Sequence, residues 1–366
     1  MTSAPNMTGD SPSSRMTYGN YLRLDELLNL QSGPEGHLPA PCNDEMHFII
    51  VHQAFELWFK LINRELEEAL QLMNVSEVSE ENIPKVVHHL ERCSEIFRLM
   101  ADQWKVMETL TPQDFLAFRD RLGTSSGFES WQMRSLEMLL GLDPEQRIGG
   151  MDPMEHNRKL HKEGKLSDEV MMEMERISSL PSINDVVKNW LSRTPVNGVS
   201  GDLDVLTNYV QSHLMSMEKH NESVISHMVK IGHGKEEQIR PRLESGLESA
   251  RDFLLPEGKV DPSRAGLLFI ESYRNLPLLS WPRTLIDTLV ELEESMLLFR
   301  THHVRMVERM IGRRMGTGGS SGVDYLDMTL KYRIFKDLWA IRTMLVKQEL
   351  LPEVENPEFY GFALKN

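Results

Sequence analysis

The chain has 366 residues, enough for one large domain or two smaller ones with a substantial core. Its 55 acidic and 40 basic residues give a formal charge of −15, which argues against nucleic acid as a partner. The two cysteines, Cys42 and Cys93, lack the spacing of a metal or redox motif, and this favours a reducing, cytoplasmic setting.

The first residues are rich in Ser, Pro and Thr and have no apolar core, so we predict a disordered tail over 1–15 and no signal peptide. No apolar run is long enough to span a membrane, and no membrane partner is expected. The predicted domain, 16–366, opens with a short amphipathic helix over 17–28 that begins with two tyrosines.

A long helix is predicted over 44–73, and its start is apolar on nearly every side, as in the central helix of a bundle. His52 lies on one ladder of this helix, together with Phe48, Phe55 and Phe59, and is therefore expected to point inward. The alternative is a structural histidine that only bonds to a neighbouring backbone.

The next helices are predicted over 82–110 and from Thr111 to Gly123. Thr111 is suited to be the N-cap of the second one, because proline follows it and an acid stands three residues later. This short helix carries Phe115 and Arg119. Aromatic neighbours suit a half-buried guanidinium that binds a carboxylate, although a single arginine is commonly a surface residue.

Further helices are predicted to fill the rest of the chain, at 125–140, twice within 154–180, and at 203–231, 237–254, 262–273, 284–311 and 325–351. His213, His220 and His227 repeat every seven residues on one of them. They would lie about 10 Å apart, too far to share a metal ion, so we interpret them as a polar stripe. No alternating strand pattern occurs, and the sequence predicts an all-α fold.

The helix over 284–311 has a single apolar ladder, and His303 is its only imidazole. The adjacent His302 falls on a ladder with Ser295 and Arg305 that is predicted to face solvent. A glycine-rich loop follows at 316–322. Its free N–H groups and hydroxyls could close over an anion or polar ligand, or it could be a surface turn.

Two inward histidines on separate central helices, His52 and His303, suggest a planar apolar cofactor clamped in the bundle. Haem b is the natural candidate, because one neutral imidazole binds its iron and the opposite face stays open to O₂. The chain has no Cys-x-x-Cys-His, so any haem is held without thioether bonds. A helical protein without a metal remains the alternative on chemistry alone.

The segment DEMHFIIVHQAFELWFK at 44–60 closely resembles the signature of the tryptophan 2,3-dioxygenase family. The same holds, in the family's order, for YGNYL at 18–22, FR at 118–119 with SGF at 126–128, and HVRMV at 303–307 through GTGGS at 316–320. The resemblance implies an all-α haem enzyme that uses O₂ to cleave the indole C2–C3 bond of L-tryptophan, giving N-formyl-L-kynurenine.

The resemblance also implies roles for single residues. His303 would be the proximal haem ligand, His52 the catalytic histidine at the indole nitrogen, and Arg119 the partner of the substrate carboxylate. Thr317 would meet the ammonium and carboxylate end of the substrate. The indole pocket and the carboxylate end would be lined by Phe48, Ile49, Ile50, Val51 and Phe115. The resemblance further implies a homotetramer built as a dimer of dimers. In it, each subunit would insert into the site of its neighbour the residues Tyr18, Tyr21 and Leu22.

Three residues depart from the family's usual pattern. Phe115 stands where tyrosine is more frequent, His47 where leucine is usual, and Glu129 where glutamine is usual. Some relatives insert a single oxygen atom into a substituted indole. The alternatives are therefore haem-dependent monooxygenation of tryptophan or a substituted tryptophan, and a haem protein that binds gas without catalysis.

Overall fold

The computed structural model describes residues 16–33, 40–314 and 322–361. Within these ranges the chain is built from helices, and one isolated bridge between Val196 and Val199 is the only β-type pairing. The all-α prediction is confirmed. None of the helices in the described part of the chain is long and apolar enough to cross a membrane.

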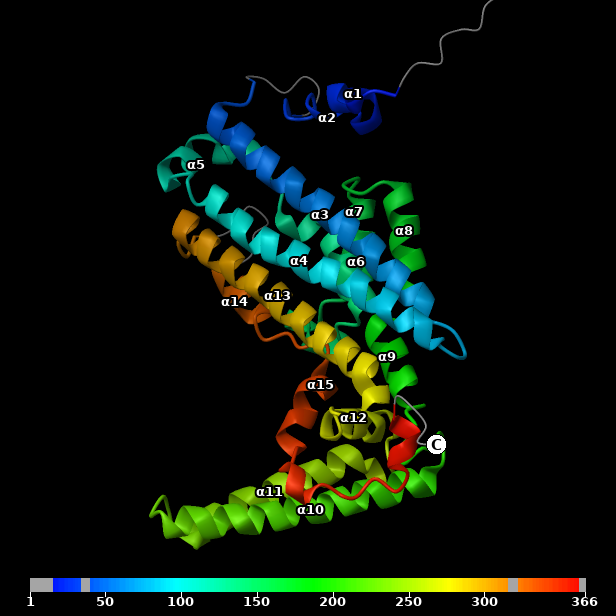
Figure 1. The fold of residues 1–366 in the computed structure, drawn as a ribbon. Helices are drawn as coiled ribbons and strands as arrows, with labels where there is room; N and C mark the ends of the chain where they lie inside the picture. Colours follow the sequence, from blue (N-terminus) through cyan, green and yellow to red (C-terminus); the bar gives the residue numbers. More distant parts are fainter. Residues whose placement is uncertain (1–15, 34–39, 315–321, 362–366) are drawn as a thin grey trace, which may run out of the picture.

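Three long helices form the centre of the molecule: α3 (Asn43–Met73), α4 (Ile83–Met107) and α13 (Ser280–Ile311). Figure 1 shows α4 lying between the other two. Each of the three contributes fully buried apolar side chains to one core, for example Ile62, Leu90 and Leu285. The sequence predicted these helices to within a few residues, because long amphipathic ladders are a strong local signal.

Shorter helices cover one side of this centre. The helix α6 (Trp131–Leu140) packs on α3, and α8 (Asp168–Ser178) packs on both α6 and α7 (Pro153–Lys162). Two further helices, α9 (Ile183–Leu191) and α12 (Pro262–Ser272), pack against each other. The sequence analysis did not predict α9, although a capping box formed by Ser182 and Asp185 marks its start.

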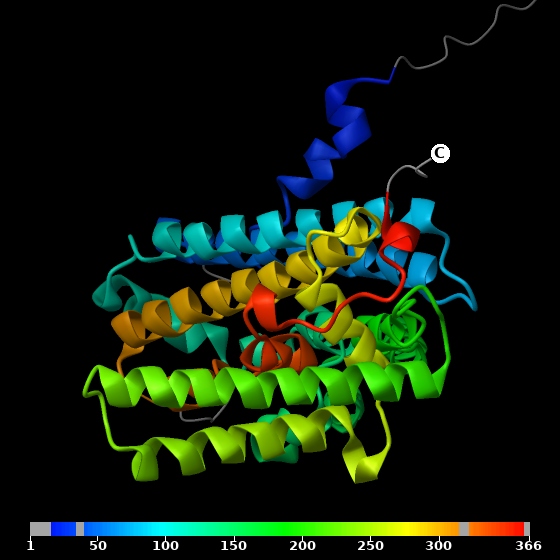
Figure 2. The same cartoon turned by 60° about the horizontal axis from the view of Figure 1, so that its bottom comes forward.

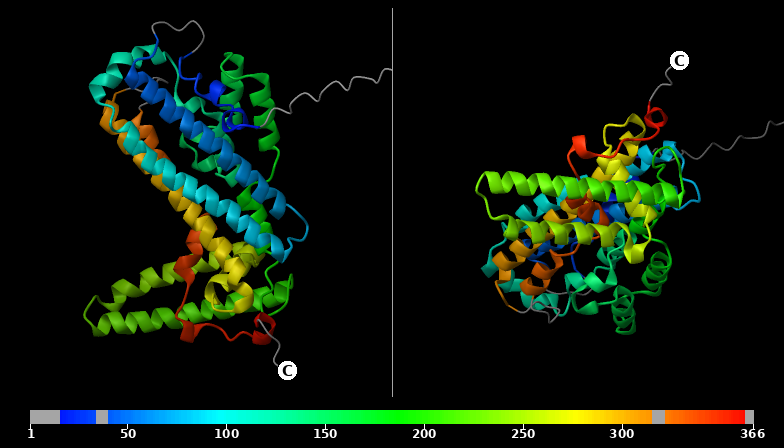
Figure 3. Two further views of the ribbon diagram at one scale, coloured as in Figure 1. Left: turned by 45° about the horizontal axis from the view of Figure 1, so that its top comes forward. Right: turned by 90° about the horizontal axis from the view of Figure 1, so that it is seen from below.

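A long helical pair, α10 (Leu203–Lys230) and α11 (Glu236–Leu254), crosses one end of the bundle. Figure 2 shows the pair from its outer side, and Figure 3 shows it against the three central helices. The predicted polar stripe on α10 is wrong for His213. Its side chain is buried, and Nε2 lies 2.9 Å from the carbonyl oxygen of Met344, because the C-terminal segment covers this face of α10.

The single last helix predicted over 325–351 is also wrong. The chain instead forms α14 (Val323–Thr329), α15 (Lys336–Ala340) and the 3₁₀ turns Ile341–Met344, Gln348–Leu350 and Pro357–Tyr360. The buried carboxylate of Glu293 accepts hydrogen bonds from the backbone N–H of Ile334 and from Nε1 of Trp339. These bonds hold the break between α14 and α15, and a continuous helix could not make the first of them.

The first two helices, α1 (Tyr18–Leu22) and α2 (Leu24–Leu27), lie apart from the bundle in Figure 1. Neither has a buried residue, and the side chains of Tyr18 and Tyr21 are 76% and 74% exposed. The predicted tail over 1–15 lies outside the described residues.

Candidate active site

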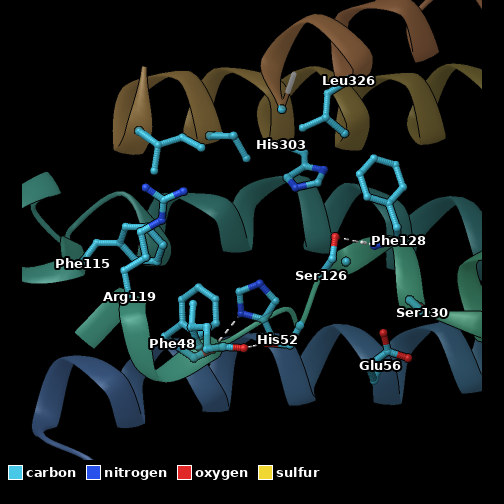
Figure 4. Close-up of a pocket in the computed structure, with 16 residues that line it drawn as sticks. Phe48, His52, Glu56, Phe115, Arg119, Ser126, Phe128, Ser130, His303 and Leu326 are labelled. Atoms are coloured by element: carbon cyan, nitrogen blue, oxygen red, sulfur yellow. Dashed lines mark hydrogen bonds between the residues drawn. The ribbon is translucent and has the colours of Figure 1, made fainter. Parts of the chain in front are cut away.

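A cavity of about 380 Å³ opens between α3, α13 and the segment that follows α4. That segment contains α5 (Pro112–Phe118) and the 3₁₀ turns Arg119–Leu122 and Gly127–Glu129. Figure 4 shows the side chains that line the cavity. A second cavity of about 130 Å³ shares His52 and His303 with the first and extends toward α4 and α6. The two predicted inward histidines therefore face the same larger cavity.

His303 points from α13 into this region (Figure 4). Its ring stacks on the indole of Trp104, with the ring centroids 4.5 Å apart and the planes only 4° from parallel. Within the described part of the chain, His303 has no hydrogen-bond partner for either ring nitrogen. Burial lowers the pKa of His303 to about 3, so the imidazole is neutral near pH 7 and has a free lone pair.

His52 points into the same cavity from α3 (Figure 4). Its Nδ1 lies 2.8 Å from the carbonyl oxygen of Phe48. A carbonyl can only accept, so Nδ1 carries the hydrogen and Nε2 is left as an unprotonated acceptor. Burial also lowers the pKa of His52, which keeps the ring neutral. The alternative of a structural histidine bonded to a neighbouring helix is not what the structure shows, because this bond is made within α3 and leaves the other nitrogen available.

Aromatic rings and one guanidinium line the end of the cavity near α5. The ring of Phe48 lies 5.9 Å from that of Phe115 and 5.7 Å from that of Phe118, measured between centroids. Arg119 follows directly after α5 and lines the cavity half-buried. The predicted N-cap is confirmed, since the hydroxyl oxygen of Thr111 accepts the backbone N–H of Asp114. Such a cap fixes where α5 begins and hence where Arg119 lies.

Comparison with known proteins supports a family assignment. The sequence profile described as tryptophan 2,3-dioxygenase matches residues 3–345. The chain is 40% identical to the tryptophan 2,3-dioxygenase of Sorangium cellulosum, over 96% of this chain and 88% of the relative. It is 40% identical to tryptophan 2,3-dioxygenase 2 of Ralstonia nicotianae, over 95% and 98%, and 33% identical to the tryptophan 2,3-dioxygenase of Dictyostelium discoideum, over 96% and 88%.

The chain belongs to the tryptophan 2,3-dioxygenase family. Several residues that the resemblance to this family assigned to the site are brought together by the fold. Phe48, His52, Phe115, Arg119 and His303 line the larger cavity.

Residues 48–51, which the resemblance assigned to the indole pocket, lie on different sides of α3, because successive helical residues are rotated by about 100°. Of these four residues only Phe48 lies on the cavity. Ile50 is 48% exposed on the outer side of α3. Ile49 is half-buried away from the cavity, and Val51 is buried in the core, where its carbonyl oxygen accepts a hydrogen bond from Gln103 at 3.1 Å.

Other residues implied by the family lie outside the cavity of this chain. Tyr18, Tyr21 and Leu22 are exposed on α1 and do not line it. Thr317 and most of the glycine-rich loop lie outside the described residues.

The three departures from the family pattern have different surroundings. Phe115 is buried at the cavity wall, His47 has a buried Nε2 without a hydrogen-bond partner among the described residues, and Glu129 pairs with Lys165 at 2.9 Å.

The predicted solvated face of α13 is wrong for two of its residues. His302 donates a hydrogen bond from Nδ1 to the carbonyl oxygen of Ala101 in α4, at 2.8 Å, because a carbonyl oxygen can only accept. Ser295 on the same ladder is buried. This face packs against α4, so α13 has two contact faces where the ladder alone predicted one.

Sequence reasoning missed Trp104, which stacks on His303, and it did not assign to the site the segment 125–128 and Ser130, which line the cavity. Trp104 stands four residues after Met100 and seven after Phe97, so the helical ladder of α4 could have found it. Nothing local in the sequence indicated that this ladder ends beside His303.

Proposed function

We propose that this protein is a haem-dependent dioxygenase that cleaves the C2–C3 bond of L-tryptophan with O₂ and produces N-formyl-L-kynurenine. The observation that carries the proposal is the pair of neutral imidazoles, His52 and His303, which face one cavity from different central helices. Membership of the family agrees with this activity.

The residues of the site fit haem b. His303 is a half-buried, neutral imidazole with no competing hydrogen bond in the described chain, which suits a residue that would hold the haem iron. Aromatic side chains surround it, including Trp104 and Phe299. In the bound state the haem would supply the iron at which O₂ is activated. Cys93 is buried and Cys42 is exposed, and neither lines the two cavities around His303.

The substrate would lie in the larger cavity, on the side lined by α3. Arg119 would bind its carboxylate, since a guanidinium can pair bidentately with a carboxylate in a site closed from water. Phe48 and Phe115 would pack against the indole. A neighbouring subunit of a homotetramer would contribute to the site Tyr18, Tyr21 and Leu22. The glycine-rich loop would contribute Thr317.

His52 would accept the indole N–H through Nε2 and orient the ring. Full removal of this proton before the reaction is unfavourable, because the indole N–H is far less acidic than an imidazolium with a pKa near 6.5. A hydrogen bond to neutral imidazole needs only the correct geometry. His52 is therefore proposed as a catalytic residue that positions the substrate and not as an obligatory base.

The decisive experiment is turnover of the haem-loaded, anaerobically reduced protein with O₂ and L-tryptophan, followed by mass spectrometry. Ring-opened product with two added oxygen atoms is expected. A gain of one oxygen atom would instead indicate a monooxygenase. Reversible O₂ binding with no product from any indole amino acid would contradict the enzymatic proposal and favour a gas-binding protein.

A further inference from the structure

A buried ionic cluster adjoins the second cavity and is not used by the function proposed above. Its centre is the carboxylate of Glu137 on α6. Oε2 accepts hydrogen bonds from Arg134 at 2.8 Å and Arg147 at 2.7 Å, and Oε1 accepts one from Arg300 at 2.7 Å. All four residues are less than 9% exposed.

The charges within this cluster do not balance. Three guanidiniums share one carboxylate, so the cluster holds two more positive than negative charges. Glu56 also lines the second cavity, but its carboxylate accepts a hydrogen bond from Gln132 and pairs with none of these arginines. Burial lowers the pKa of Arg300, the carboxylate of Glu137 raises it, and the neighbouring arginines lower it further. Buried charge without a counter-charge is strongly destabilising.

The cluster has donors available on the cavity side. Arg134, Glu137 and Arg300 line the second cavity, and Arg147 lies behind them. The one hydrogen bond of Arg134 among the described residues goes from Nη1 to Glu137, so its other N–H groups can serve a ligand. Arg300 is held by Glu137, by the carbonyl oxygen of Thr329 and by the ring of Tyr332.

We propose that this arginine cluster is the binding site for a propionate carboxylate of haem. The cluster consists of Arg134, Arg147 and Arg300 around Glu137. The inference rests on the proposed function. The second cavity combines this cationic end with His303 and the aromatic rings of Phe59, Trp104 and Phe299. A flat apolar group with an anionic edge matches both halves of this lining, whereas an inorganic anion would match the cluster alone.

The first test compares haem with its dimethyl ester, in which the propionates are neutral, on the unaltered full-length protein. Each is loaded, and its loss to excess apomyoglobin is followed by the Soret band. The ester is expected to leave at least about ten times faster than haem, because charge-assisted hydrogen bonds to the arginines are lost. Equal rates of loss, with binding still dependent on His303, would overturn this inference and leave the proposed function intact. Failure of both compounds to bind would overturn both proposals.

The second test assigns the effect to the cluster. Arg134→Gln should lose haem several-fold faster and show a smaller difference between haem and its ester, while Arg134→Lys should restore part of the difference. Arg158→Gln is the matched control, because Arg158 is exposed on α7. Circular dichroism shows whether each variant is folded. If Arg134→Gln folds and the ratio of the two rates of loss is unchanged, the assignment to the cluster is contradicted. If the variant does not fold, the comparison of haem with its ester on the unaltered chain is the deciding test.

Discussion

His52 and His303 are the same residue type in one cavity, and their hydrogen bonds give them different chemistry. His52 donates through Nδ1 to the carbonyl oxygen of Phe48, so its tautomer is set and only Nε2 can act. His303 has no such bond in the described chain, and stacking on Trp104 holds its ring instead. A metal ligand needs an unengaged lone pair, whereas an orienting acceptor needs a fixed ring.

Replacement of His303 by alanine should abolish or transform the Soret band of the haem-loaded protein, because the proposed axial ligand is lost. Absorption spectroscopy measures this directly. His227→Ala is the control, since His227 is exposed on α10, whereas His302 is unsuitable because it bonds to Ala101. An unchanged spectrum in His303→Ala would exclude His303 as the ligand.

The pH dependence of kcat/KM should report His52. Burial lowers its pKa below the ordinary 6.5, and the neutral form, which predominates above that pKa, is the proposed acceptor. Activity should therefore hold from pH 8 down past about 6.5 and fall only at lower pH. His52→Ala should keep turnover reduced by about ten- to a thousandfold, without this acid limb. A midpoint above 6.5, or the same limb in the variant, would count against the assignment.

Arg119 should matter for substrates that carry a carboxylate. Loss of one partner from a buried charge pair costs roughly 3–5 kcal/mol, which corresponds to about two to three decades in kcat/KM with L-tryptophan. Indole analogues without a carboxylate should lose far less in Arg119→Ala. Steady-state kinetics with both substrate types makes the comparison. Equal losses would indicate that Arg119 supports the fold.

At the scale of elements, helix packing depends on where small residues fall. Gly266 on α12 approaches α9 so closely that an added Cβ would lie 2.3 Å from the carbonyl oxygen of Leu191 and within 3 Å of the Thr194 side chain. The backbone oxygen cannot move aside alone, so the α9–α12 contact needs glycine at this position.

Gly266→Ala should therefore destabilise the protein by about 1–3 kcal/mol, the usual cost of overpacking a close contact. Gly246→Ala on α11 is the matched control. Nothing lies within 4 Å of its added Cβ, and alanine in a helix is better than glycine by about 1 kcal/mol. Denaturant unfolding of both variants should shift the midpoint in opposite directions. An unchanged unfolding midpoint in Gly266→Ala would mean that α9 and α12 can move apart enough to accommodate the added methyl group.

At the scale of the whole molecule, α1 and α2 present tyrosine and leucine side chains that the chain itself does not cover. If these residues enter a neighbouring subunit, sedimentation should give about four times the chain mass of 42.2 kDa. Tyr21→Ala should then raise KM for L-tryptophan while the variant still binds haem. A monomer with full activity would rule out a contribution from the neighbouring subunit.

The sequence alone determined the features that depend on local spacing. Ladders of apolar residues predicted α3, α4 and α13 and the inward direction of His52 and His303. The N-cap at Thr111 could also be predicted, because Thr111, Pro112 and Asp114 lie within four consecutive residues. Periodicity and capping involve only neighbours along the chain, so one sequence carries the whole signal.

Only the tertiary structure decided the features that depend on distant partners. Glu293 breaks the predicted last helix by bonding to Ile334, 41 positions away, and Arg300 meets Glu137 across 163 positions. His213 became a core residue for the same reason, because Met344 covers it. A buried polar group is stable only where a partner is provided, and helical spacing does not say which distant segment provides it.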